Sequence, residues 1–145
     1  MAAMDESHTP LILRPEQGRR YEMGRMSAIF KADGAETAGR SSISEWWLES
    51  QTFGPGTHAH DEDHIFYVIE GTLDLTIDGQ SSSLAKGSYA IIPGGTRHDF
   101  ANLGATRAGF ISINMPGGFE ARMPAIAAAL SAEDLSLPPE ARGRA

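Results

Sequence analysis

The stretch that decides the fold reads Gly54-Pro-Gly-Thr-His58-Ala-His60-Asp-Glu-Asp-His64-Ile-Phe-Tyr-Val-Ile-Glu-Gly71. It holds three of the five histidines in the 145-residue chain. Side chains alternate between the two faces of a strand, so His58 and His60 share a face if the segment is extended. His64, again at an even-numbered position, has the same parity and would lie on that face too. The residues after His64 are strand formers. The pattern predicts three imidazoles on one face of a β-hairpin.

A second stretch, Gly87-Ser-Tyr-Ala-Ile-Ile-Pro93-Gly-Gly95-Thr-Arg-His98-Asp-Phe-Ala-Asn102, supplies a fourth histidine. Gly87 opens a strand after a turn, and Pro93-Gly-Gly95 predicts a tight turn. His98 is expected on a strand that neighbours the strand of His64. Imidazole is the commonest protein ligand of catalytic transition metals, so four histidines on a rigid β scaffold indicate one metal site built from His58, His60, His64 and His98.

The first stretch resembles the first motif of the cupin superfamily, which is His-x-His, three or four residues, Glu, six residues, Gly. Here His58-x-His60 is followed by three residues, His64, six residues and Gly71. The glutamate of the family motif is therefore replaced by His64. This departure makes the chain resemble the minority of cupins that carry four histidines.

The second stretch matches the second cupin motif without a mismatch: Gly87, five residues, Pro93-x-Gly95, two residues, His98, three residues, Asn102. The resemblance covers about residues 41–120. Residues 65–71 and 115–120 are similar to small bacterial cupins grouped with the quercetin dioxygenases. The resemblance implies an all-β fold, a single cupin (double-stranded β-helix or jelly-roll) barrel with short C-terminal helices, and a homodimer.

Composition bounds the remaining possibilities. Hydrophobic residues make up 41% of the chain with no run near the roughly 20 apolar residues of a membrane span, and the polar start is no secretory signal, so we expect a cytoplasmic protein without membrane contact. The absence of cysteine excludes disulfides and thiolate ligands, which leaves nitrogen and oxygen donors for a metal. A net charge of −7 argues against a nucleic-acid partner.

The chain divides into three expected parts. Residues 1–10 are expected to be disordered, residues 11–120 to form the barrel, and residues 121–145 to form a helical segment and a loose tail. Within the barrel part, strands are expected at 11–13, 26–30, 42–51 and 107–115. The alternation of Thr72–Ile77 before Asp78-Gly79 predicts a half-solvated strand that ends in a hairpin turn. Short helices are expected at 121–130 and 131–134.

Further candidate site residues follow from strand parity. Phe66 and Val68 share the parity of His64, and Phe100 shares that of His98. With Phe110 and Trp46 they are candidates for a substrate-binding wall, although ordinary core packing explains each of them equally well. Glu62 is a candidate catalytic carboxylate, against the simpler reading of residues 61–63 as a solvated acidic turn.

Several functions remain open at this point. The leading hypothesis is a dioxygenase that uses one divalent transition metal (Fe, Mn, Ni, Cu or Zn) to cleave an aromatic, flavonol-like or enolisable small molecule, with O₂ as a possible co-substrate. A metal-dependent isomerase or lyase would use the same Lewis acid without O₂. A non-catalytic barrel that binds a metal and a small molecule, or a closed structural zinc site, is the non-enzymatic alternative.

Overall fold

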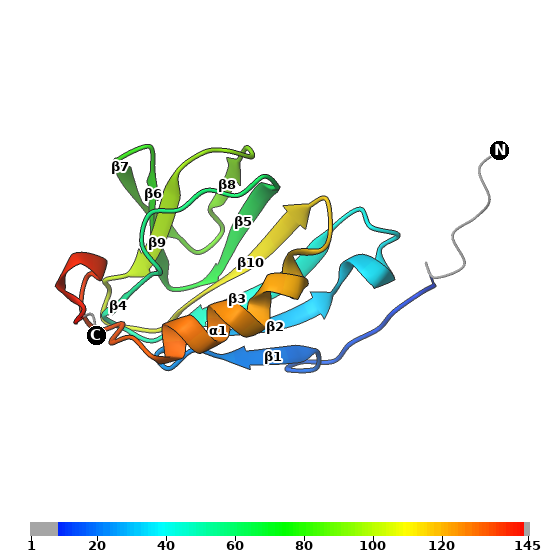
Figure 1. Ribbon diagram of the computed structural model, residues 1–145, viewed down its shortest axis with the longest axis horizontal. Helices are drawn as coiled ribbons and strands as arrows, with labels where there is room; N and C mark the ends of the chain where they lie inside the picture. The colour runs from blue at the N-terminus through cyan, green and yellow to red at the C-terminus, as the bar shows by residue number, and fades with distance from the viewer. Residues whose placement is uncertain (1–8, 144–145) are drawn as a thin grey trace.

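The structure, a computed structural model, describes residues 9–143 as two antiparallel β-sheets packed face to face (Figure 1). In spatial order the six-stranded sheet contains β1 (Arg19–Glu22), β2 (Met26–Ala32), β3 (Ser42–Leu48), β10 (Ala108–Met115), β5 (Asp63–Glu70) and β8 (Tyr89–Ile92). The four-stranded sheet contains β4 (Thr52–Phe53), β9 (His98–Asn102), β6 (Thr72–Ile77) and β7 (Gln80–Ala85). The all-β jelly-roll prediction is confirmed, although the two sheets are not hydrogen-bonded into one closed barrel.

The core lies between the sheets because most of the long strands bury alternate residues. In β3, Ser42, Ser44, Trp46 and Leu48 are buried while the residues between them are partly exposed. In β6 the same period buries Leu73 and Leu75, as the alternation of this segment predicts. The inward side chains of both sheets therefore form a single hydrophobic cluster.

The turn after β6 has the backbone that its sequence favours. Asp78 and Gly79 have φ angles of 48° and 82°, and β6 pairs with β7 up to Ile77 opposite Gln80. A two-residue hairpin loop with positive φ at both positions matches the right-handed twist of the flanking strands, and Asp-Gly is a favoured pair there. The predicted hairpin is confirmed.

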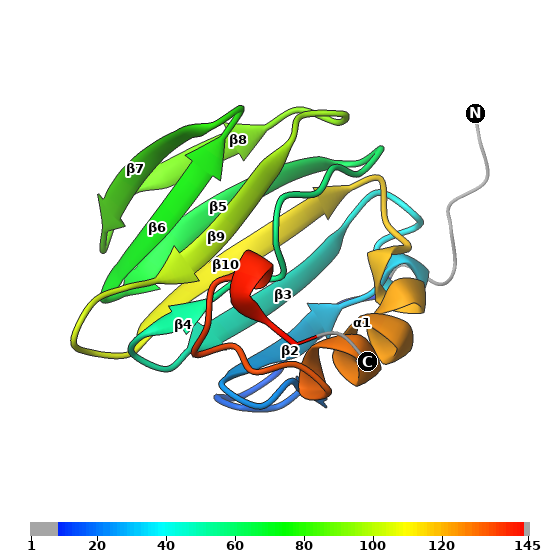
Figure 2. The ribbon, with the colours of Figure 1, turned by 60° about the vertical axis from the view of Figure 1, so that its left-hand side comes forward.

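The C-terminal segment lies alongside the sheets. After β10 the chain forms the 3₁₀ turn η2 (Phe119–Arg122), the helix α1 (Met123–Ser131) and the 3₁₀ turn η3 (Pro139–Ala141). Figure 2 shows α1 next to β2, near the β1–β2 edge of the six-stranded sheet. Met123 and Leu130 of α1 are buried in the core. Within residues 9–143, no helix is long and apolar enough to cross a bilayer.

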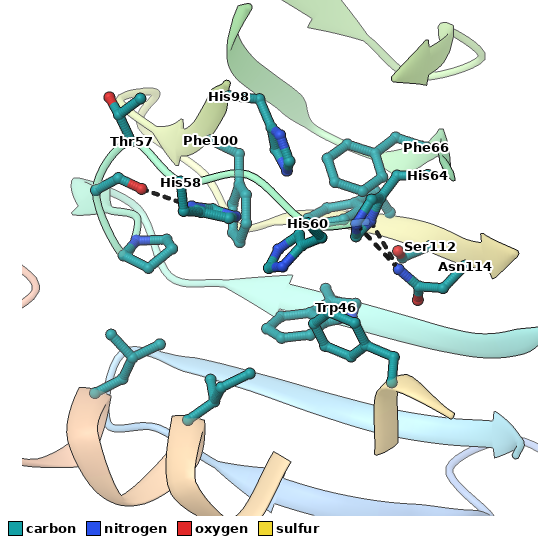
Figure 3. A pocket seen from close by; sticks show the side chains of 16 residues that line it. Trp46, Thr57, His58, His60, His64, Phe66, His98, Phe100, Ser112 and Asn114 are labelled. Carbon is teal, nitrogen blue, oxygen red and sulfur yellow. Dashed lines mark hydrogen bonds between the residues drawn. The ribbon is translucent and has the colours of Figure 1, made fainter. Parts of the chain in front are cut away.

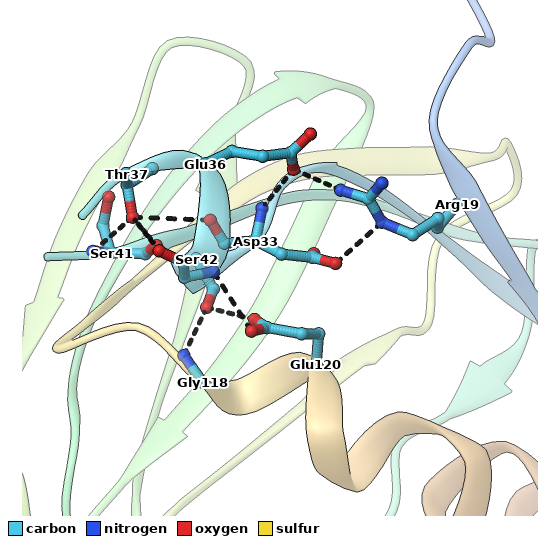
Figure 4. A network of polar contacts seen from close by, with 9 residues as sticks. Arg19, Asp33, Glu36, Thr37, Ser41, Ser42, Gly118 and Glu120 are labelled. Atoms are coloured by element: carbon cyan, nitrogen blue, oxygen red, sulfur yellow. Dashed lines mark hydrogen bonds and ion pairs between the residues drawn. The ribbon is translucent and has the colours of Figure 1, made fainter. Parts of the chain in front are cut away.

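A polar network fixes the position at which this segment leaves the sheet. The Glu120 carboxylate accepts hydrogen bonds from the Ser42 hydroxyl at 2.5 Å and from the Gly34 amide, at the start of the 3₁₀ turn η1 (Gly34–Glu36), at 3.1 Å (Figure 4). The Gly118 amide donates to the same hydroxyl at 2.9 Å. Ser42 is buried, so the hydrogen bonds of its hydroxyl would be costly to lose. The network therefore holds η2, and with it Phe119, against β3.

Some expected elements are not formed. Residues 11–13 make no strand, and Leu11, Ile12 and Leu13 are exposed. The N-terminal edge strand is instead β1, whose sequence Arg-Arg-Tyr-Glu carries no apolar alternation because its side chains are mostly exposed. The helix expected at 131–134 is also wrong, since α1 ends at Ser131. The expectation of disorder for residues 1–10 concerns mainly residues 1–8, which lie outside the described residues.

The described part of the C-terminal tail is packed rather than loose. Leu135 is buried and its carbonyl accepts a hydrogen bond from the Phe53 amide at 2.8 Å. Arg142 is 5% exposed and donates to the Gly54 carbonyl at 2.7 Å. The sequence of this tail has no apolar period, so only the tertiary contact with β4 and the residue after it explains its order.

Candidate metal centre

The four motif histidines come together between the two sheets. His58 lies outside the named strands and forms an isolated antiparallel bridge with His98 at the start of β9, with N–H···O distances of 3.0 and 2.9 Å. His60 follows in the same loop, and His64 lies on β5. The predicted hairpin carrying all three histidines is therefore wrong, because His58 and His60 lie on a loop that precedes the strand.

The relation of His64 to His98 is also different from the prediction. β5 belongs to the six-stranded sheet and pairs with β10 and β8, whereas β9 belongs to the four-stranded sheet and pairs with β6 and β4. The two histidines are thus not on neighbouring strands. They face each other across the sandwich, with ring centroids 5.2 Å apart.

The predicted tight turn at Pro93–Gly95 is present, and it holds the histidine loop in place. The Gly95 amide donates to the His60 carbonyl at 2.7 Å, and the Gly94 amide donates to the Asp63 carboxylate at 2.7 Å. A Cβ at Gly94 would lie 2.1 Å from the Asp61 carbonyl oxygen. Any larger residue at Gly94 would therefore push the loop that carries His60 away from the site.

Two backbone carbonyls orient the imidazoles of His58 and His98. The Nδ1 atom of His58 lies 2.6 Å from the Gly56 carbonyl oxygen, and that of His98 lies 2.9 Å from the Thr96 carbonyl oxygen. A carbonyl only accepts, so each Nδ1 carries the proton and each Nε2 keeps its lone pair. Protein metal sites commonly orient their histidines in this way.

Three of the histidines present their nitrogens at a common point. One ring nitrogen each of His58, His60 and His98 lies within 4.8 Å of the other two, which is a separation that one ion can bridge. His58 and His60 have ring centroids 4.7 Å apart, and His58 and His98 have centroids 4.4 Å apart (Figure 3). The donor set is all nitrogen, which suits a divalent transition metal.

The protonation of the histidines agrees with metal binding. Burial, followed by the neighbouring imidazoles, lowers the pKa of His60 from its ordinary value of 6.5 to about 4, and that of His64 to about 3. Burial also lowers the pKa of His98. These rings are neutral near pH 7, and a neutral ring is the form that donates to a metal.

The same shifts predict how the stability of the metal-free protein depends on pH. Because the pKa of His60 and His64 is lower in the folded protein than in the unfolded chain, the unfolded chain binds more protons between about pH 3, the folded value of His64, and 6.5. The free energy of unfolding is therefore expected to be lost progressively as the pH falls through this range. Urea unfolding in the presence of a chelator, at several pH values, measures this slope. A His60→Gln variant should show a shallower slope, and an equal slope in both proteins would contradict the assignment.

The histidines open into a largely aromatic cavity of about 270 Å³. Of the predicted wall residues, Trp46, Phe66, Phe100 and Phe110 line it. Val68 is not among the residues that line it. Val68 is buried in the core opposite Phe110, and the rings of Phe66 and Phe110, with centroids 4.6 Å apart, lie on the cavity wall in its place.

Glu62 does not line the cavity either. One of its carboxylate oxygens pairs with the Arg122 guanidinium, and the other is buried without a hydrogen-bond partner. The guanidinium lies 4.7 Å from the ring centroid of Phe119, which itself lines the cavity and contacts His60 edge-on. Among the described residues, Glu62 therefore links the histidine loop to η2 and is not placed as a catalytic carboxylate.

The structure adds cavity residues that the sequence analysis missed. Phe119, Ile126 and Leu130 come from the C-terminal segment, and Ser112 and Asn114 come from β10. Parity could have found the last two, because Ser112 and Asn114 share the face of Phe110 while Ile111 and Ile113 point outward. Polar residues on the buried face of a strand are a signal of a functional site. Nothing in the sequence of α1 points to this cavity.

Comparison with known proteins agrees with this fold. Residues 45–114 match the family described as Cupin domain. Over 118 residues, the chain is 33% identical to the quercetin 2,3-dioxygenase of Bacillus subtilis (strain 168), which covers 79% of this chain. The chain spans about a third of the length of that relative, 34%.

Solved structures share the fold. An RmlC-like cupin from Shewanella frigidimarina superposes with a TM-score of 0.67 at 18% identity, over 79% of this chain and 98% of that chain. KdgF from a Halomonas species gives a TM-score of 0.68 at 16% identity, over 78% and 99% of the two chains. These similarities show the cupin fold over the 78–79% of the chain that they cover.

Proposed function

From the cupin fold and the cupin-domain match, we propose that this protein is a metal-dependent dioxygenase acting on a compact aromatic, flavonol-like or enolisable small molecule. The observation that carries the proposal is the convergence of His58, His60 and His98 at one end of an aromatic cavity. The likeness to a quercetin 2,3-dioxygenase supports the oxidative form of the proposal. A structural zinc site would be closed by its ligands, whereas these histidines face a cavity.

The residues of the proposed site have different roles in binding a metal and a substrate. A divalent transition metal held by the histidines supplies a Lewis acid and open coordination positions. The carbonyls of Gly56 and Thr96 keep the rings of His58 and His98 in the tautomer that leaves Nε2 free. Neutral imidazoles do not cancel the metal charge, so the site favours an anionic or enolisable oxygen on the substrate.

The cavity restricts what can bind. Its volume of about 270 Å³ lies at the lower end of small-molecule pockets, which span roughly 300–1,000 Å³. Trp46, Phe66, Phe100, Phe110 and Phe119 supply flat apolar faces for an aromatic ring. No carboxylate belongs to the described lining; a metal held by the histidines would lower the pKa of a bound substrate hydroxyl, and solvent water would take its proton.

Oxygen uptake tests the proposal directly. The protein is loaded separately with Fe²⁺, Mn²⁺, Ni²⁺ and Cu²⁺, and O₂ consumption is followed with flavonols, β-diketones and phenolic alkenes. We expect uptake with at least one metal and one substrate class, and none in His60→Ala treated in the same way. Full loading with no uptake by any combination would contradict the oxygenase proposal and favour non-oxidative Lewis-acid chemistry in the same cavity.

A further inference from the structure

His64 differs from the other three histidines in what its nitrogens contact. The Nδ2 atom of Asn114 lies 2.8 Å from Nδ1 of His64 and 3.3 Å from Nε2 (Figure 3). His64 is 4% exposed and Asn114 is 1% exposed, so water does not compete for this contact. The nitrogen-bearing edge of His64 therefore faces an amide on the cavity wall.

The hydrogen bond from Asn114 uses the imidazole lone pair of His64 that would otherwise bind a metal. An amide –NH₂ group only donates, and a neutral imidazole has one acceptor nitrogen. The shorter contact makes Nδ1 of His64 the acceptor, so Nε2 carries the proton. Neither nitrogen of His64 then has a free lone pair, in contrast to Nε2 of His58 and of His98.

The ring of His64 lies close to two of the three histidines whose nitrogens converge. Its ring centroid lies 4.9 Å from that of His60 and 5.2 Å from that of His98. The His60 and His98 centroids are 5.6 Å apart, and both residues belong to the converging set. His64 is absent from that set although it lies no farther from His60 and His98 than these two lie from each other, which agrees with an imidazole whose nitrogens face Asn114.

We propose that the metal is held by His58, His60 and His98, and that Asn114 holds His64 off the metal as a hydrogen-bonded neutral imidazole on the cavity wall. This inference rests on the proposed metal site. Asn114 is then a positioning residue that sets the number of protein ligands. One coordination position that a four-histidine site would fill stays open to substrate or O₂, and the proton on Nε2 of His64 is available to a ligand oxygen.

The proposal predicts that a suitable change at Asn114 would make His64 a fourth protein ligand of the metal. In Asn114→Asp, the amide donor is replaced by a carboxylate that only accepts. The Nδ1 atom of His64 must then carry the proton, which leaves Nε2 with its lone pair, and a carboxylate behind a histidine is a common arrangement at metal sites. We expect Asn114→Asp to bind Cu²⁺ about tenfold or more tightly than the parent. The double variant Asn114→Asp/His64→Ala separates this effect from the added negative charge, because it keeps the charge and lacks the ring.

The experiment combines Cu²⁺ titration calorimetry with electron paramagnetic resonance, in which nitrogen superhyperfine lines count the bound imidazoles. The expected count is three in the parent and in His64→Ala and four in Asn114→Asp, with affinity in His64→Ala changed by less than about tenfold. If His64→Ala weakens binding as strongly as His60→Ala does, or if the parent spectrum shows four nitrogens, the inference is overturned while the metal site stands. If His60→Ala binds Cu²⁺ like the parent, the metal site itself is wrong.

Discussion

Replacing His98 by alanine is expected to weaken the binding of a divalent transition metal by about a hundredfold or more. His98 is 2% exposed, its Nδ1 is tied to the Thr96 carbonyl, and it is one of three histidines whose nitrogens converge. Removing the imidazole takes away one nitrogen donor and leaves a buried gap beside His58. No described carboxylate lines the cavity that could take its place as a ligand. Metal content after dialysis and calorimetric titration with Zn²⁺ and Ni²⁺ measure the loss.

The chain offers a matched control for this variant. His8 lies outside both motifs and outside the described residues, so His8→Ala removes one imidazole that belongs to neither motif. Its metal affinity should equal that of the parent. Circular dichroism checks that His98→Ala remains folded. Undiminished metal binding in both His60→Ala and His98→Ala would contradict the assignment of the centre.

Replacing Phe110 by alanine is expected to lower the free energy of unfolding by about 3–5 kcal/mol. Phe110 is 1% exposed and lies in the middle of the aromatic cluster, with ring centroids 4.6 Å from Phe66, 5.3 Å from Phe100 and 6.3 Å from Trp46. Truncation removes these contacts and leaves an empty volume next to a cavity that already exists. Urea unfolding of the metal-free protein measures the change.

Tyr67 provides the comparison for Phe110. It lies on β5 of the same sheet but is 45% exposed, and its side chain is on the opposite face from Phe66. Tyr67→Ala is expected to cost less than about 1 kcal/mol, because an exposed aromatic residue has little packing to lose. Phe110→Leu, which fills part of the space, provides a measurable intermediate if Phe110→Ala does not fold. Equal costs for Phe110→Leu and Tyr67→Ala would contradict the central role of Phe110 in the core.

The parts of the site that the sequence predicted are those governed by local rules. Pro93–Gly95 predicted a turn because glycine and proline restrict the backbone in known ways, and the turn is present. Parity correctly predicted that Phe66 and Phe100 point inward. The prediction of a shared strand face for His58 and His60 was wrong, because these residues lie on a loop and their backbone is not part of a strand. Parity also placed Val68 inward, where it is buried, but facing the core does not by itself place a residue at the cavity.

The sequence alone indicated short strands of a sandwich or barrel and four histidines at motif spacing, because alternation, turn residues and spacing are properties of neighbouring residues; the jelly-roll itself was implied by the cupin resemblance. Only the tertiary structure decided that the site forms between two sheets, that Phe119, Ile126 and Leu130 close its cavity, and that Asn114 faces His64. Asn114 and His64 are 50 positions apart and meet through the pairing of β10 with β5. The orientation of an imidazole depends on such a partner, and no local pattern specifies which residue the opposite strand will place there.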